Sequence, residues 1–104
     1  MTITPSAALM DAIVLAVVSR EESAYGYKIT QDIRDVMEIS ESTLRRLQKD
    51  GCLEVYDQEF SGRNRRYYRL TPQGREQLQE TLGEWESYKD RLDRIFYRSE
   101  RKEP

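Results

Sequence analysis

Arginine side chains gather in one short stretch, residues 61–71, which reads Ser-Gly-Arg-Asn-Arg-Arg-Tyr-Tyr-Arg-Leu-Thr. Residues 61–75 carry a net charge of +5, whereas residues 1–60 sum to −5 and the whole 104-residue chain to −2. Clustered guanidinium groups bind phosphate through charge-assisted hydrogen bonds. A solvated hairpin that carries arginine for solubility is the alternative. Positive charge concentrated on one element of an acidic protein favours an anionic partner, above all a nucleic-acid backbone.

These arginines lie on the return strand of a predicted β-hairpin. Residues 52–60 alternate apolar and polar side chains, which is the period of a strand, and Gly62 lies at the turn. Alternate residues of the return strand must lie on opposite faces: Arg66, Tyr68 and Leu70 on one, and Arg65, Tyr67 and Arg69 on the other.

Helical patterns flank the hairpin on both sides. We predict helices at residues 5–19 (capped by Thr4), 25–37 (capped by Ser23) and 41–50 (capped by Ser40), followed by one at residues 72–97 with Thr71 as its cap and Pro72 at its first position. The last helix would be about 39 Å long at 1.5 Å per residue.

The helix at residues 41–50 has only Leu44 and Leu47 as apolar members, which leaves hydroxyls and basic side chains for its exposed surface. A short capped helix of this kind, followed at once by a basic hairpin, is the layout of a winged helix-turn-helix, in which that helix enters the major groove. Three residues lie in the first turn of the preceding helix, Tyr25, Tyr27 and Lys28. Either the tyrosines pack with their hydroxyls at the surface, or this turn contacts phosphate from the N-terminus of the helix.

The predicted fold class is therefore α+β and mostly α: a winged helix-turn-helix at residues 1–71, with its wing at about 52–71, then a dimerisation helix at 72–98 and a charged tail at 99–104. Apolar residues recur along the last helix at spacings of four, three, seven and four, namely Leu78, Leu82, Trp85, Leu92 and Phe96. A domain of this size cannot cover such a stripe alone, so we expect a twofold dimer.

Several kinds of chemistry lack their residues in this sequence. Without histidine, neither a His-based zinc site nor a His-based triad can form, and no glycine-rich phosphate loop is present. We therefore expect no enzymatic activity, cofactor or metal. The lone Cys52 is read as a small buried residue, with a redox sensor as the alternative. Because residues 12–18 form the longest apolar run and no basic residue precedes it, we expect a cytosolic protein without membrane contact.

Together the elements resemble the PadR family of bacterial transcriptional regulators, specifically the short type with one C-terminal helix. The matching segments are residues 25–29 (Tyr-Gly-Tyr-Lys-Ile), 39–44 (Ile-Ser-Glu-Ser-Thr-Leu), 46–51 (Arg-Leu-Gln-Lys-Asp-Gly) and 62–75, and Trp85 falls where many members carry tryptophan. The resemblance implies a dimeric winged-helix repressor whose first and last helices build the dimer. Some relatives bind flat aromatic drugs or phenolic acids between subunits, with the last-helix tryptophans stacking on the ligand.

One segment departs from the family pattern. Members carry an aromatic residue after the Thr-Leu pair and a further apolar residue before Arg-Leu, whereas here Arg45 follows Leu44 directly, so that about four residues are absent. Either the recognition helix is one turn short or the sequence lacks a turn. The poor anchor that two leucines offer favours the missing turn.

The leading hypothesis is thus a homodimeric DNA-binding repressor with duplex DNA and a small aromatic effector as partners. The candidate DNA contacts are Tyr27 and Lys28 on the backbone, Ser42, Thr43, Arg45 and Arg46 in the major groove, and Arg63, Asn64, Arg65 and Arg66 on the wing. The rival is a winged-helix module that binds an acidic protein. A third interpretation gives Trp85 the main role as a ligand-stacking residue, although a tryptophan in a helix seam more often packs in a dimer core.

Overall fold

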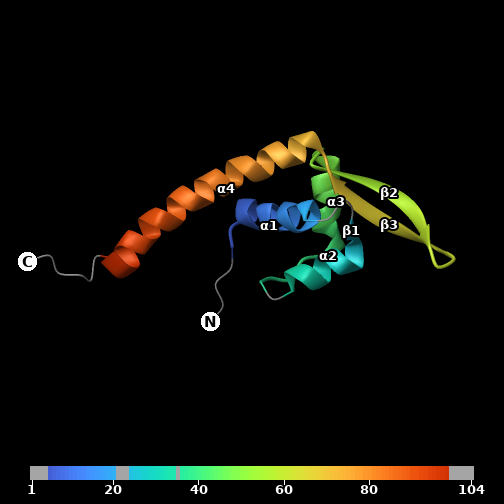
Figure 1. The fold of residues 1–104 in the computed structure, drawn as a ribbon, viewed down its shortest axis with the longest axis horizontal. Helices are drawn as coiled ribbons and strands as arrows, with labels where there is room; N and C mark the ends of the chain where they lie inside the picture. Colours follow the sequence, from blue (N-terminus) through green and yellow to red (C-terminus); the bar gives the residue numbers. More distant parts are fainter. Residues whose placement is uncertain (1–4, 21–23, 35, 99–104) are drawn as a thin grey trace, which may run out of the picture.

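Helices cluster at one end of a small sheet, whose hairpin projects away from them, and one long helix extends toward the opposite side (Figure 1). The computed structural model describes residues 5–20, 24–34 and 36–98. The elements are α1 (Ala7–Ser19), β1 (Ala24–Tyr25), α2 (Gly26–Ile33), α3 (Glu41–Lys49), β2 (Leu53–Phe60), β3 (Arg63–Leu70), α4 (Pro72–Asp93) and the π-helical turn η1 (Arg94–Arg98). The radius of gyration is 17.1 Å, whereas a compact domain of this length has about 13 Å.

The hydrophobic core lies where α1, α2 and α3 meet the inner face of the sheet. α1 is apolar on most sides and buries Val14, Leu15 and Val18 almost completely. α3 contributes only Leu44 and Leu47, and both are 0% exposed. Two leucines are therefore enough to seat this helix, because both of them are covered on every side.

The three strands form an antiparallel sheet in the order β1-β3-β2. β2 and β3 pair without a break from Leu53 opposite Leu70 to Phe60 opposite Arg63. Ser61 and Gly62 form the two-residue turn, with φ angles of 52° and 81°, as a type I′ hairpin requires. The register confirms the predicted faces: Tyr68 and Leu70 are buried toward the core, and Tyr67 lies on the outer face.

A set of hydrogen bonds, hereafter the joint, connects Asp50 and Gly51 at the end of α3 to Thr71 and Gln73 at the start of α4. Thr71 caps α4, since its Oγ1 accepts from the Gly74 amide at 2.9 Å and donates to the Gly51 carbonyl at 2.6 Å. Gln73 Nε2 donates to the Asp50 carbonyl at 3.1 Å. A Cβ atom on Gly74 would lie 2.1 Å from the Cys52 carbonyl oxygen, so only glycine fits there.

The structure corrects several predicted boundaries. α1 begins at Ala7 with Ser6 as its cap, not at Pro5, while Thr4 and Ser23, the expected caps, lie outside the described residues. α2 ends at Ile33 rather than Met37, and its N-cap is Tyr25. The regular part of α4 ends at Asp93. The predicted tail, 99–104, is also outside the described residues.

The prediction of a missing turn in α3 is wrong. The helix runs without interruption from Glu41 to Lys49, and Arg45 pairs with Glu41 one turn earlier at 3.6 Å, across the Leu44–Arg45 junction. This protein therefore has a genuinely short third helix of nine residues.

Candidate nucleic-acid interface

α3 presents a polar and basic face to solvent. At 100° per residue, Ser42, Arg45 and Lys49 lie opposite Leu44 and Leu47, and all three are exposed. Arg45 and Glu41 are 69% and 78% exposed, so their pairing holds the arginine only weakly. Thr43 is half-buried at the edge of this face. Lys49 was not among the predicted contacts, although its position four residues after Arg45 places it on the same face.

Arg46 has a different role from the other basic side chains of α3. It pairs with Asp11 of α1 and with Asp50, the latter at 3.3 Å, and Asp11 is only 14% exposed. The hydrogen bond that Arg46 donates to the Asp11 carboxylate raises the pKa of Arg46 above its ordinary value. The pair between Arg46 and Asp11 therefore holds α3 against α1.

The start of α2 lies beside the sheet, because β1 leads directly into it. Tyr27 in its first turn is 69% exposed. Lys28 pairs with Asp32 at 3.4 Å, and each of these two side chains is more than a third exposed. Both predicted backbone contacts are thus accessible at the N-terminus of a helix, where the helix dipole favours anions.

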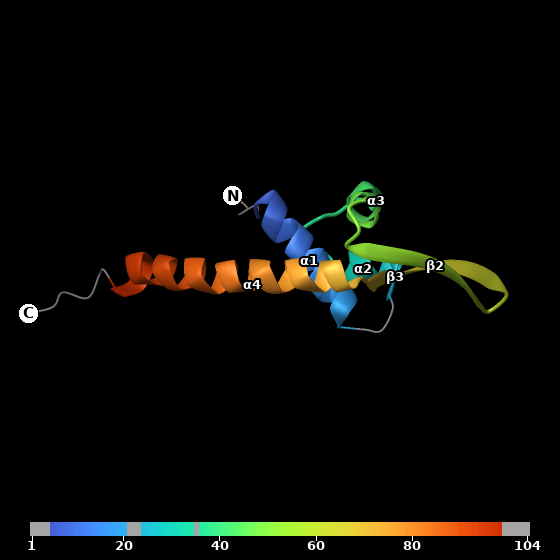
Figure 2. The same ribbon diagram turned by 90° about the horizontal axis from the view of Figure 1, so that it is seen from above.

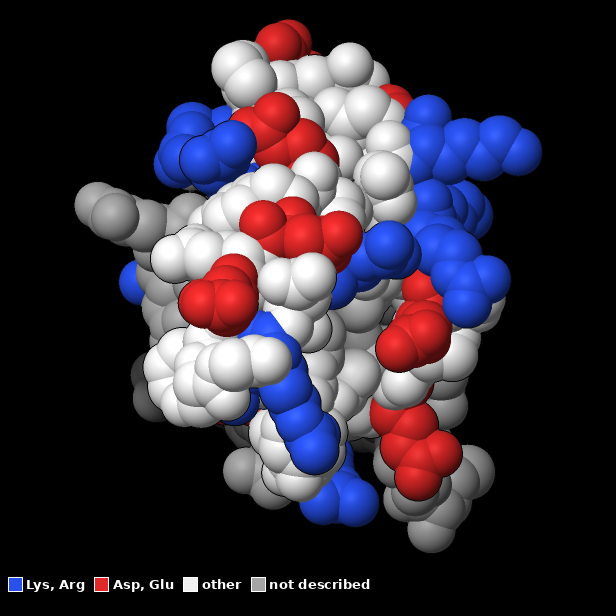
Figure 3. Space-filling model, turned by 90° about the vertical axis from the view of Figure 1, so that its right-hand side faces the viewer, with Lys and Arg blue, Asp and Glu red and all other residues white. Residues whose placement is uncertain are grey.

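The β2–β3 hairpin, hereafter the wing, is much less basic than its sequence suggests. Its register places β2 carboxylates beside β3 arginines: Glu54 pairs with Arg69 at 2.7 Å, and Asp57 lies 3.9 Å from Arg66. Glu59 lies opposite Asn64. Residues 53–70 therefore carry a net charge of only +1. Figure 3 views the molecule from the wing end and shows acidic side chains interspersed among the basic ones.

Arg63 and Arg65 are the two wing arginines whose charge is not offset in this way. Among the described residues, neither has a carboxylate within ion-pair distance. Arg63 is exposed beside the turn, whereas Arg65 is half-buried, with its guanidinium over the rings of Tyr25 and Phe60. The sequence-based prediction did not place Tyr25 or Phe60 beside Arg65, since the strand that brings Tyr25 next to β3 has only two residues.

α4 presents an apolar stripe beyond the core. Leu78 is 4% exposed and belongs to the core of the single chain, so it is not part of an outer surface. Leu82 and Phe96 are 39% and 53% exposed, and Trp85 and Leu92 are half-buried. Trp85 lies 6.3 Å from Tyr88 between ring centroids. Figures 1 and 2 both show α4 continuing past α1, which leaves its C-terminal half without a neighbour among the described residues.

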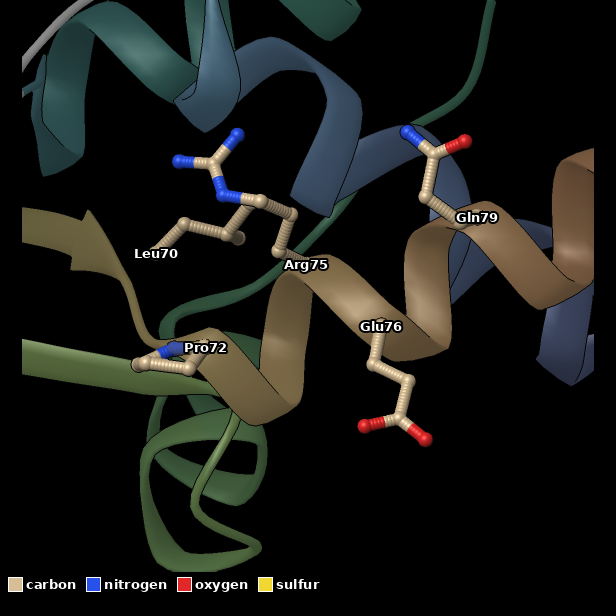
Figure 4. Close-up of a pocket in the computed structure, with 5 residues that line it drawn as sticks. All are labelled: Leu70, Pro72, Arg75, Glu76 and Gln79. Carbon is tan, nitrogen blue, oxygen red and sulfur yellow. The ribbon is translucent and has the colours of Figure 1, made fainter.

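The start of α4 also borders a shallow groove lined by Leu70, Pro72, Arg75, Glu76 and Gln79. Arg75 and Gln79 point to the side on which α1 lies, and Glu76 points away (Figure 4). Nearby, Cys52 is 1% exposed, and its Sγ donates to Gln77 Oε1 at 3.2 Å. Burial raises the pKa of the Cys52 thiol. This favours the interpretation as a small buried residue over that as a redox sensor.

A short helix packed across two others and followed by a hairpin defines the winged helix-turn-helix class of proteins. A model of the transcriptional regulator PadR-like family matches residues 14–80 of this chain. The chain belongs to this family, whose members are DNA-binding transcription regulators and not enzymes. Among the described residues, no helix is both long enough and apolar enough to cross a membrane.

Two solved structures and one further protein are similar to this chain along most of its length. A Streptococcus mutans UA159 protein, smu.1704, is 39% identical, with a TM-score of 0.83 over 99% of this chain and 100% of that one. A transcriptional regulator from Clostridium thermocellum is 30% identical, with a TM-score of 0.72 over 86% and 94% of the two chains. An uncharacterized Lysinibacillus sphaericus protein is 36% identical over 81% of this chain and 84% of its own.

Proposed function

We propose that this protein is a cytoplasmic, homodimeric transcriptional repressor. In this proposal residues 1–71 bind duplex DNA and residues 72–98 join the two subunits. The observation that carries the DNA-binding part is the orientation of α3: its two leucines are fully buried, so its hydroxyl and basic face must point outward. Such a face suits the major groove, where arginine binds guanine and hydroxyls bind several base edges.

The proposed contacts fall into three groups. Ser42, Thr43 and Arg45 read base edges, and Lys49 joins them. On the wing, Arg63, Asn64 and Arg65 contact phosphate or the minor groove. Arg66 can do so only when its ion pair with Asp57 is broken. Tyr27 and Lys28 contact the backbone at the start of α2. Arg46 acts indirectly, because its pairs with Asp11 and Asp50 hold α3 in place.

The uncovered stripe on α4 supports a twofold dimer. Pairing of this stripe with a second copy would cover Leu82, Leu92 and Phe96, which one chain leaves partly or largely exposed. A twofold axis between the subunits then gives two copies of α3, which suit half-sites about 34 Å apart along one face of a duplex.

A flat aromatic effector is the proposed signal. Trp85 and Tyr88 are neighbours on α4, so a twofold dimer would bring two such pairs near the subunit boundary. Aromatic rings in a partly apolar site stack on planar ligands. Ligand that occupies this boundary would change the spacing of the two α3 helices and so release DNA.

The test combines footprinting on the DNA upstream of the protein's own gene with light scattering on the free protein. We expect a protected, twofold-symmetric site and a dimeric mass at micromolar concentration. A protein that stays monomeric there, or that ignores duplex DNA at low salt, would overturn the proposal. Binding to an acidic protein without affinity for DNA would instead support a protein-interaction module. Quenching of the single tryptophan by planar aromatic compounds, together with weaker DNA binding, tests the effector.

A further inference from the structure

The guanidinium of Arg65 lies over two aromatic rings on the outer face of the wing. Its guanidinium carbon is 4.0 Å from the ring centroid of Phe60 and 4.4 Å from that of Tyr25. Phe60 ends β2, and Tyr25 belongs to β1, so the strands on both sides of β3 each contribute one ring. Phe60 pairs with Arg63 in the ladder. It is therefore the diagonal neighbour of Arg65 on the same face, within reach of a long side chain.

The other arginines of this hairpin are held differently. Arg69 also lies over a ring, that of Tyr56 at 4.9 Å, but its charge is paired with Glu54 at 2.7 Å. Arg66 points to the opposite face, near Asp57. Arg65 is thus the wing arginine whose side chain is immobilised by aromatic contacts while its charge is not offset by a carboxylate of the described residues.

Stacking leaves the hydrogen-bonding edge of a guanidinium free. The group is planar, and its N–H donors point outward in that plane, so a ring that stacks on a face of the group does not block them. An arginine held in this way can bind a phosphate with two donors at once. It also loses less side-chain freedom on binding, and immobilising a long side chain otherwise weakens binding by a factor of about 2 to 13.

We propose that Phe60 and Tyr25 are positioning residues that hold Arg65 ready for a DNA phosphate. This inference rests on the proposed function, because it assumes that the wing meets DNA. It assigns a role to two aromatic residues that contact no DNA themselves. It also makes Arg65 a stronger phosphate contact than Arg66.

A double-mutant cycle with Phe60→Leu and Arg65→Ala tests the coupling. The probe is a mixed-sequence duplex of about 30 base pairs, which is long enough for two half-sites. We expect Phe60→Leu alone to weaken binding about three- to tenfold without changing the salt slope, because the arginine still reaches its phosphate. Arg65→Ala should reduce the slope by about one per subunit. In the Arg65→Ala background, Phe60→Leu should have no further effect.

An equal effect of Phe60→Leu in both backgrounds would overturn the proposal, since the ring would then act independently of Arg65. No effect of Phe60→Leu in the wild-type background would overturn it as well. If Phe60→Leu misfolds, Arg65→Lys takes its place: it retains the charge but not the planar group. Arg65→Lys should weaken binding about threefold or more, whereas the matched Arg66→Lys should stay within about twofold. Equal effects of the two lysine variants would contradict the assignment.

An NMR measurement separates this inference from the proposed function. Ring currents should shift the Arg65 side-chain protons upfield in the wild type, and Phe60→Leu should reduce that shift. If the shift is present but the protein ignores the duplex, the proposed function fails and the positioning role fails with it. If the protein binds the duplex but the shift is absent, only the positioning role fails.

Discussion

The two halves of α4 differ most clearly at their glycines. At Gly74, in the first turn, a Cβ atom would lie 2.1 Å from the Cys52 carbonyl oxygen. At Gly83, in the middle of the helix, nothing lies within 4 Å of the same added atom. The first half is thus packed closely against the Cys52 backbone, whereas the second half projects away from the rest of the described chain. The two halves of one helix therefore differ in their surroundings.

Hydrogen bonds connect the start of α4 to the end of α3. Thr71 and Gln73 bond to the carbonyls of Gly51 and Asp50, the residues that end α3. A displacement of α4 would therefore reach α3 through a short set of hydrogen bonds. Under the proposed function, a movement of the projecting half would be transmitted through these bonds to the residues that we propose to read DNA.

The largest effect is expected for Gly74→Ala. The clash is with backbone, which cannot move aside as a flexible side chain would, so we expect the free energy of unfolding to fall by more than about 3 kcal/mol. Chemical denaturation monitored by circular dichroism measures it. The matched control is Gly83→Ala, which should raise stability by about 0.5–1 kcal/mol, because alanine is the better helix former in open space. Equal effects of the two substitutions would remove the contrast between the halves.

A slightly smaller effect is expected for Leu78→Ala. Leu78 is 4% exposed in the single chain, so its truncation should cost about 3 kcal/mol in the free energy of unfolding. This cost should be the same at low and high protein concentration, because the lost contacts lie within one chain. Leu82→Ala, one turn later, is the matched control, and its cost should grow with protein concentration as dimers form. A concentration-dependent cost for Leu78 would place it in the dimer contact after all.

Much of this architecture could be predicted from local patterns. The cap at Thr71 with Pro72 after it, the strand alternation and the helical stripe of α4 all depend on neighbouring residues. The two-residue strand β1 could not be predicted, because a period of two has no meaning over Ala24 and Tyr25. It forms only because β3 has a free edge for it to pair with.

The candidate site was harder to predict than the fold. Counting charge along the chain grouped Arg65 and Arg66 as equals, whereas the register places them on opposite faces with different partners. The sequence likewise predicted Arg46 as a major-groove contact. In the structure Arg46 instead donates a hydrogen bond to Asp11 of α1, which lies 35 positions earlier in the chain. Charge neutralisation across strands and between helices depends on tertiary pairing, which no local pattern contains.

The joint between α3 and α4 can be tested with Thr71→Val. This change removes the cap of α4 and leaves the Gly51 carbonyl without its hydroxyl donor, at a combined cost of about 2 kcal/mol. Cys52 lies beneath the joint and is 1% exposed, so a thiol reagent reaches it only when the joint opens. We expect Thr71→Val to speed native-state labelling of Cys52 about tenfold or more. Thr71→Ser, which retains the hydroxyl, is the control and should label at close to the wild-type rate.

The smallest effect on a single chain, and a decisive one on assembly, is expected for Phe96→Ser. Phe96 is 53% exposed, and its nearest aromatic neighbour is Tyr97 at 6.1 Å, so the substitution should change the stability of the isolated chain by less than about 0.5 kcal/mol. If the projecting half of α4 binds a second copy, the same change should shift the monomer–dimer equilibrium in sedimentation toward monomer. Glu80→Ser is the matched control, because Glu80 lies on the far side of the helix from the apolar stripe. Loss of dimer with Glu80→Ser but not with Phe96→Ser would mean that the subunits meet through the opposite face.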